Sequence, residues 1–282
     1  MKVFTVACCL VWGASQSAEA AAFLETPVQD TAVIELFAVP SPDEVLHYVS
    51  KDELKYHPRL LNKTVNKTLY GTSKEQYLAL GCYLADLAYC VSFRQSSTAL
   101  EYFQVIDEMG KNLNIFPSQI EKIKNRFSDN IGNVDTLKQL YYDVYEIVMD
   151  NLFETSRFNH YTLVSAGAFV ESVYLAVNST QMDMQSNDFK RRLGDQKLIL
   201  DQLQSMIGKY LDKTTKEMML SEIKSIVAAF DAYSTKTSPP TAQKRYDGAV
   251  VISSNRSAES TKKSLMELNA ELTKLRMLWS KN

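Results

Sequence analysis

Residues 73–89 read SKEQYLALGCYLADLAY, and residues 164–176 read VSAGAFVESVYLA. Both stretches are apolar around nearly the whole helical circumference, which is typical of helices buried in the core of a bundle. Each carries a glycine, Gly81 or Gly167, with an aromatic residue two positions later. A glycine inside a helix costs ~1 kcal/mol relative to alanine, so both glycines predict close approach of another helix. We therefore expect two buried helices to lie side by side at the centre of the fold.

The two segments also resemble each other in context. Each is followed by an amphipathic partner helix, residues 98–113 in the first case and 189–211 in the second. Two copies of a helical hairpin stacked about a pseudo-twofold axis would give this pattern. Chance similarity between two buried helices would also give it, so both explanations stay open.

A single acid lies in each apolar segment, Asp86 in the first and Glu171 in the second. A buried carboxylate must be paired, hydrogen-bonded, neutral or directed into a cavity, because an unpartnered one is costly. By helical spacing Tyr83 shares a face with Asp86, and Tyr174 shares a face with Glu171. If the two faces meet, Tyr83, Asp86, Glu171 and Tyr174 form an acidic ligand pocket edged by tyrosines.

Two other interpretations of these acids are open. A buried ion pair would fix how the helices pack, with the cation supplied by a basic residue of another helix. The candidates for that cation are Arg94, Arg191, Arg192 and Lys197. Catalysis by the acidic pair is the third and least favoured interpretation, because the rest of a catalytic constellation cannot be assembled from the sequence.

Helix-start signals and apolar periodicity extend the prediction along the chain. Ser41-Pro42-Asp43-Glu44 combines an N-cap, a proline at the first helical position and a capping box, and Ser73 to Gln76 is interpreted as a second capping box. Further helices are expected near residues 97–113, from 116 onward, and at 134–154, 159–177, 187–211 and 214–233. The predicted fold class is all-α, a single antiparallel bundle of about eight to nine helices.

The C-terminal helix, expected at residues 258–280, carries an apolar seam. Its members alternate at spacings of three and four residues: Leu265, Leu268, Leu272, Leu275 and Trp279. About two heptads are too few for a stable free coiled coil, so we expect this helix to dock on the bundle. A dimer or partner-binding seam is the alternative.

Two short segments are exceptions to the helical pattern. Gly248 to Ser253 is β-branched and predicts a strand, which pairs with residues 33–37 if a minor two-stranded ribbon forms. The expected organisation is a signal peptide at 1–20, a lead-in at 21–40, a helical core domain at 41–235, a linker with a short strand at 236–256 and the docked helix at 257–282.

The N-terminus predicts export. Met1-Lys2 is a minimal positive start, Val3 to Trp12 is a short apolar run, and Ala18-Glu19-Ala20 has the small-x-small form of a signal-peptidase site. The run is too short to span a bilayer as a stable anchor. Thr5-Val6-Ala7-Cys8 resembles a lipobox, so lipidation at Cys8 is the alternative to soluble export.

Composition excludes several classes of protein. The net charge of −2 gives no electrostatic reason to bind nucleic acid, and nine glycines and seven prolines are too few for a β-sandwich. Cys82 and Cys90 lie about 12 Å apart along one helix, beyond the ~7 Å reach of a disulfide, so both are expected as buried thiols.

No motif in the chain predicts catalysis, a metal or a cofactor. The three histidines, His47, His57 and His160, are scattered without metal-ligand spacing. No G-x-S-x-G elbow, phosphate-binding loop or dinucleotide fingerprint is present. A non-enzymatic protein is therefore the favoured interpretation.

The segments 73–89 and 164–176, together with RLGDQK at 192–197 and Val39-Pro40-Ser41-Pro42, resemble a family of uncharacterised exported helical proteins of Bacteroidota. The resemblance covers residues 37–235. It implies a periplasmic or outer-membrane-facing location, often with a lipid anchor, and implies no activity.

These observations predict an exported protein of the periplasm or cell envelope that binds an unknown protein or small molecule and no nucleic acid. The binding site would lie around Asp86 and Glu171. The alternatives are an enzyme that uses this acidic pair and a structural or assembly protein that acts through its C-terminal helix.

Overall fold

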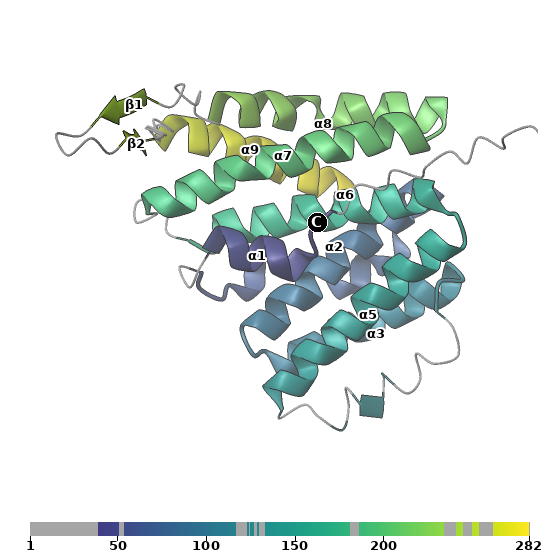
Figure 1. The fold of residues 1–282 in the computed structure, drawn as a ribbon. Coiled ribbons are helices and arrows are strands. Elements are labelled where there is room, and N and C mark those ends of the chain that lie inside the picture. Colours follow the sequence, from purple (N-terminus) through teal and green to yellow (C-terminus); the bar gives the residue numbers. More distant parts are fainter. Residues whose placement is uncertain are drawn as a thin grey trace, which may run out of the picture. The chain divides into compact units, whose positions relative to one another are not determined.

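The described part of the chain is a bundle of α-helices with one small hairpin (Figure 1). The computed structural model describes residues 39–50, 54–116, 133–180, 186–233, 241–244, 250–253 and 262–281, and the single residues Ile123, Asn125, Arg126 and Asp129. All of these belong to one compact unit, Leu36–Asn282. The predicted signal sequence, Cys8 and most of the helix expected after residue 116 lie outside the described residues.

The helix positions agree with the sequence prediction to within a few residues, and the all-α bundle is confirmed. The α-helices are α1 (Pro42–Ser50), α2 (Ser73–Ser92), α3 (Ser96–Asn112), α5 (Val134–Glu154), α6 (Phe158–Asn178), α7 (Asn187–Tyr210), α8 (Lys213–Tyr233) and α9 (Lys262–Ser280). The segment between α1 and α2, expected to be a loop, contains two short 3-10 helices, η1 (Pro58–Leu60) and η2 (Thr64–Thr68).

The capping boxes define the starts of α1 and α2. At α1 the Glu44 amide donates to Ser41 Oγ at 3.3 Å, and the Ser41 amide donates to Glu44 Oε2 at 2.7 Å, as predicted. At α2 the predicted box from Ser73 is wrong by one residue, because Thr72 is the N-cap and Glu75 completes the box. The Glu75 carboxylate also accepts the Gly71 amide at 2.9 Å, and a charged acceptor satisfies free amides better than a glutamine does.

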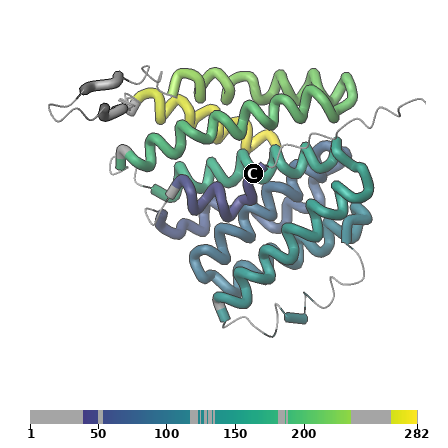
Figure 2. Tube along the Cα trace, in the orientation of Figure 1, coloured from purple at the N-terminus to yellow at the C-terminus, as the bar shows by residue number. Residues whose placement is uncertain are grey.

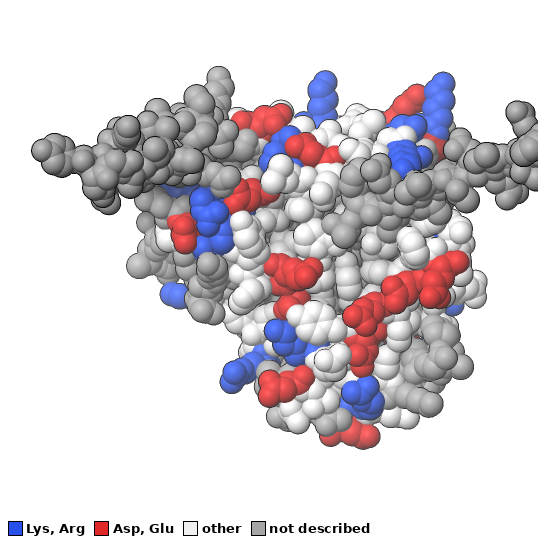
Figure 3. Space-filling model, viewed as in Figure 1, with Lys and Arg blue, Asp and Glu red and all other residues white. Residues whose placement is uncertain are grey.

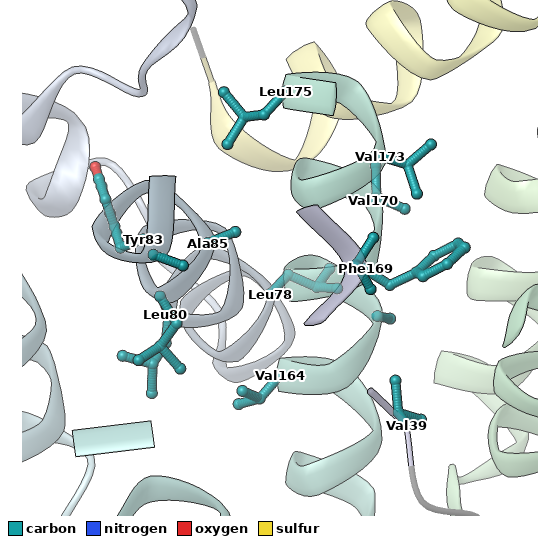
Figure 4. Close-up of a cluster of buried hydrophobic side chains, with 14 of the residues drawn as sticks. Val39, Leu78, Leu80, Tyr83, Ala85, Val164, Phe169, Val170, Val173 and Leu175 are labelled. Atoms are coloured by element: carbon teal, nitrogen blue, oxygen red, sulfur yellow. The ribbon is translucent and has the colours of Figure 1, made fainter. Parts of the chain in front are cut away.

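Helices α2 and α6 approach each other backbone to backbone at the two glycines. A Cβ atom on Gly81 would lie 2.1 Å from the carbonyl oxygen of Val164, and one on Gly167 would lie 2.0 Å from that of Leu78. Each glycine thus meets the residue three positions before the other glycine, a reciprocity that the pseudo-twofold interpretation predicts. Figure 4 shows Leu78 directed from α2 towards α6.

The remaining helices surround this crossing. On one side α3 packs on α2, and α5 packs on α2, α3 and α6; on the other side α7 packs on α6, and α8 packs on α7 and α9 (Figure 1). Helix α1 lies against α2, α6 and α7. Figure 2 follows the chain from α1 in purple to α9 in yellow, which returns to lie beside α8 and α6.

The apolar seam of α9 is occupied within the chain. Its five members are between 0 and 5 % exposed: Leu265, Leu268, Leu272, Leu275 and Trp279. The helix packs against α2, α6 and α8. These side chains are therefore buried in the chain itself rather than displayed for a partner helix.

The predicted strand is present but pairs with a different segment. β2 (Val250–Ser253) is antiparallel to β1 (Thr241–Lys244), with Thr241 opposite Ser253 and Lys244 opposite Val250. The predicted pairing with residues 33–37 is therefore incorrect for this sheet, and residues 33–37 lie outside the described residues. A local hairpin closes a far shorter loop than a pairing of the two chain ends, so it costs less conformational entropy.

Alanine at either crossing glycine should destabilise the protein severely. The added methyl groups of Gly81→Ala and Gly167→Ala meet backbone atoms, which cannot rotate away, so we expect a loss of about 3 kcal/mol or more, the upper end of overpacking costs. Urea unfolding followed by circular dichroism measures this loss.

Gly208→Ala is the matched control. Gly208 lies in α7, and no atom lies within 4 Å of the position that an added methyl group would take, so alanine there should stabilise the helix by about 0.5–1 kcal/mol. Wild-type stability in Gly81→Ala and Gly167→Ala would contradict the tight crossing.

Candidate functional site

Asp86 and Glu171 meet in a buried polar cluster at the α2–α6 contact. Both carboxylates are fully buried, on α2 and α6 respectively. Two groups from elsewhere in the chain join them: Arg276 from α9, 5 % exposed, and Asn62 from the loop between η1 and η2, 1 % exposed. The sequence prediction that the two acid-bearing helices lie together is confirmed.

Glu171 forms a two-atom ion pair with Arg276. The guanidinium Nε donates to Glu171 Oε2 at 3.0 Å, and its second nitrogen donates to Oε1 at 3.2 Å. The same guanidinium donates to the carbonyl of Leu60 at 2.7 Å and lies 4.6 Å from the ring centre of Tyr174. Arg276 thus connects α9 to α6 and to η1.

The identity of this cation differs from the prediction. Three of the four candidates serve other partners: Arg191 pairs with Asp195, Arg192 donates to the carbonyl of Val49 and pairs with Asp188, and Lys197 pairs with Asp201 and Asp231. The prediction therefore has the right kind of interaction but the wrong cation. A signal was present, because Arg276 lies four residues after Leu272 and three before Trp279, on the buried face of α9.

Asp86 has no cation of its own. Its Oδ2 accepts from the side-chain amide of Asn62 at 2.8 Å and from the backbone amide of Asn62 at 3.3 Å. Its Oδ1 is buried and has no hydrogen-bond partner in the described part of the chain. Burial, reinforced by the neighbouring Glu171 carboxylate, raises the pKa of Asp86 well above its ordinary value.

The tyrosines predicted for this site have separate roles. Tyr174 stacks on Arg276, whereas the Tyr83 hydroxyl donates to the carbonyl of Lys63 at 2.9 Å. A tyrosine that the sequence analysis did not select, Tyr102, donates to the Asn62 carbonyl at 2.5 Å and fixes the residue that caps Asp86. Asn62 and Tyr102 line a cavity of about 370 Å³. Tyr83, Asp86, Glu171 and Tyr174 line neither this cavity nor the three others described below.

The cluster holds the helices together and favours a protonated Asp86. Two acids share one guanidinium in surroundings that exclude water, and an uncompensated second negative charge there is costly. A proton on Asp86 leaves a neutral acid beside a matched Glu171–Arg276 pair. Ligand binding by these residues stays a prediction.

Asp86→Asn should change how stability depends on pH. Because the folded pKa is raised above the unfolded value of about 3.9, the folded chain holds more protons between the two values, and its free energy of unfolding falls as pH rises through that range. Asparagine removes this fall. As pH rises, the free energy of unfolding of the variant should therefore increase relative to that of the wild type by up to ~1.4 kcal/mol per pH unit.

Urea unfolding at pH 5, 6, 7 and 8 measures the difference. The exposed Asp150→Asn is the control, and its curve should run parallel to the wild type. If the curve of Asp86→Asn also runs parallel to that of the wild type from pH 5 to pH 8, Asp86 is not protonated in the folded protein over that range.

Arg276→Met should cost about 3–5 kcal/mol, because it leaves the buried Glu171 carboxylate without its cation. In Glu171→Met/Arg276→Met both charges are absent, so the double variant should recover most of that loss. Thermal and urea unfolding provide the comparison.

Arg191→Met is the matched control, since it removes a half-exposed ion pair and should cost less than ~1 kcal/mol. An additive double variant, as unstable as the sum of the two single changes, would show that the two residues do not act as a pair.

A different region of the described chain holds a sizeable cavity. It has a volume of about 560 Å³ and lies between α1 and α7, and we call it the α1–α7 groove. Its walls are mainly apolar: Val39, Pro40, Val45, Tyr48, Leu198 and Ile199. Leu198 and Tyr48 are 67 % and 42 % exposed, so apolar surface that α1 and α7 do not cover faces solvent.

One buried polar side chain lines this groove. Gln196 is 4 % exposed, and its amide nitrogen donates to the Arg192 carbonyl at 3.3 Å. Its Oε1 is buried and has no hydrogen-bond partner among the described residues. Because this oxygen is shielded from solvent, a bound ligand could donate to it only after the Gln196 side chain rotates.

Three smaller cavities have more polar rims. The largest of these, about 450 Å³, lies at the start of α2 beside the Lys74–Glu222 ion pair, and the Trp279 indole donates to Glu222 at 2.8 Å. Charged groups that are already paired leave less to offer a ligand than the unpartnered acceptor of the α1–α7 groove.

The surface charges follow the neutral composition. Figure 3 shows both signs interspersed on the visible face, with a row of acids along α5. That helix carries Asp143, Glu146, Asp150 and Glu154 at helical spacing. A face of this kind repels phosphate backbones.

Three further observations concern the cysteines, possible metal ligands and membrane-spanning helices. Cys82 and Cys90 are free and buried, as predicted. In the described part of the chain, no group of three or more His, Cys, Asp or Glu side chains is arranged to hold a metal. None of the described helices is both long enough and apolar enough to cross a membrane.

Comparisons with known proteins add no relative. No protein-family model matches the chain, and searches of curated proteins and of solved structures also find no match. The resemblance to exported helical proteins of Bacteroidota therefore stays a prediction, and the functional argument depends on the geometry alone.

Proposed function

We propose that this protein is a non-enzymatic binding protein that takes up a small, largely apolar ligand in the α1–α7 groove. The observation that carries the proposal is a mainly apolar cavity of about 560 Å³, lined by Gln196, whose Oε1 has no hydrogen-bond partner among the described residues. Small-molecule sites typically combine such a cavity, of roughly 300–1,000 Å³, with a few polar groups that orient the ligand.

The groove is a better candidate than the acid cluster. Asp86 and Glu171 are fully buried, and their polar contacts are made with Asn62 and Arg276. A ligand there would have to displace α9 and separate a buried ion pair, at a cost of several kcal/mol. The groove is open to solvent, and a ligand there needs only a rotation of the Gln196 side chain to reach its amide oxygen. The same inaccessibility argues against an enzyme that uses these acids, and the buried seam of α9 argues against assembly through that helix.

The proposed location is outside the cytoplasm, in the periplasm or cell envelope. Its support is the N-terminal signal pattern, with the resemblance to exported proteins of Bacteroidota beside it. Cys8 is the residue at which a lipid anchor would attach if the lipobox pattern is used.

N-phenyl-1-naphthylamine, an uncharged fluorescent probe with one N–H donor, tests the groove. Titration should give saturable fluorescence enhancement with one site per chain. Leu198→Asp places a charge on the apolar wall and should weaken binding at least fivefold, on a scale of about 1 kcal/mol for lost apolar contact.

Leu220→Asp is the matched control, because Leu220 is an exposed leucine of α8 outside the groove, and binding should be unchanged. Absence of saturable binding to the wild type, or equal weakening by the two variants, would refute the proposal.

A further inference from the structure

The polar groups of the α1–α7 groove have one chemical character. Three polar side chains line it besides the Tyr48 hydroxyl: Glu44, Asp195 and Gln196. Two are carboxylates, and the third has a buried amide oxygen with no hydrogen-bond partner among the described residues. No lysine, arginine or histidine is among the described residues that line the groove. The described lining of the groove therefore offers hydrogen-bond acceptors and negative charge, and the nearest cation, Arg191, is paired with Asp195.

Glu44 supplies the negative charge at the α1 side. Its Oε2 accepts the Ser41 amide at 2.7 Å as part of the capping box, which holds the carboxylate at the start of the helix. Glu44 forms none of the ion pairs found among the described residues, and its side chain is exposed at the groove. Its charge is therefore available to a bound cation.

Asp195 has a structural role on the opposite wall. The Tyr48 hydroxyl donates to its Oδ2 at 2.8 Å, and Arg191 pairs with the same oxygen at 3.1 Å. This bridge ties α1 to α7 and fixes the width of the groove at one end. The charge of Asp195 is offset by Arg191, so Glu44 and Gln196 are the two groups left for a ligand.

We infer that the α1–α7 groove selects a cationic amphiphile, an apolar body that carries a protonated amine. The inference rests on the proposed function and names its ligand class. The ammonium group would lie within the field of Glu44 and, once the Gln196 side chain rotates to expose Oε1, would donate to that oxygen. The apolar body would cover Val45, Leu198 and Ile199. An anionic amphiphile would place its charge against Glu44 and would leave Gln196 Oε1 without a donor.

Displacement of N-phenyl-1-naphthylamine by three eight-carbon competitors tests this selectivity on the full chain at pH 7. n-Octylammonium is cationic with N–H donors, n-octanol is a neutral donor, and octanoate is an anion without a donor. n-Octylammonium should displace the probe at about five- to tenfold lower concentration than n-octanol, as expected for one charge-assisted hydrogen bond near a partly exposed acid. Octanoate should be the weakest competitor.

Two conservative variants separate the contributions of the side chains. Glu44→Gln keeps the capping box and removes the charge, so the preference for n-octylammonium over n-octanol should fall to about twofold while n-octanol is unaffected. Gln196→Met keeps the length of the side chain and removes the acceptor, so both donors should weaken by about fivefold. Glu146→Gln, an exposed acid on α5, is the control and should change neither competitor.

The outcomes distinguish the two proposals. Equal displacement by n-octylammonium and n-octanol, with no effect of Glu44→Gln, would overturn the cationic selectivity and leave the binding function intact. Stronger displacement by octanoate would overturn it as well. Failure of the wild type to bind N-phenyl-1-naphthylamine would refute the binding function itself.

Discussion

The close contact of α2 and α6 at Gly81 and Gly167 is the constraint on which the rest of the structure depends. Two helices whose backbones approach this closely leave no room for side chains at the contact. The side chains that flank the contact are therefore packed tightly against one another. Asp86 follows its glycine by five residues and Glu171 by four, and the two acids meet near Asn62 and Arg276. A fold that buries two carboxylates there must also supply a cation and hydrogen-bond donors.

Arg276 supplies the cation and Asn62 the hydrogen-bond donors, and Arg276 also determines where α9 docks on the bundle. The leucine seam of α9 buries apolar surface but does not fix the axial position of the helix on the bundle, because its spacing of three and four residues repeats along the helix. Arg276 removes this ambiguity, because a slide of one heptad would leave Glu171 without its cation. The polar cluster thus gives specificity to a helix whose hydrophobic surface alone would allow several positions.

The sequence predicted the features that depend on local pattern. Helix bounds, the buried acids and the central glycines follow from residues within one or two turns of each other. Arg276 was missed because it lies 105 residues from Glu171. Periodicity places it on the buried face of α9 without saying which helix that face meets. The α1–α7 groove was missed for a similar reason: Gln196 is an ordinary polar residue in an amphipathic helix, and its unpartnered oxygen exists only once α1 packs beside α7.

The two polar sites are built for different purposes, and their surroundings explain why. At the acid cluster the partners of Asp86 and Glu171 are Asn62 and Arg276 of the same chain, so these interactions stabilise the fold. In the α1–α7 groove the walls are held from outside: Asp43 of α1 accepts from Tyr142 and from Ser92 at 3.3 Å, and Tyr48 bonds to Asp195 across the groove. A groove with walls fixed in this way loses little conformational freedom when a ligand enters. The free energy of the contact with Gln196 and Glu44 then contributes to selectivity rather than to ordering the site.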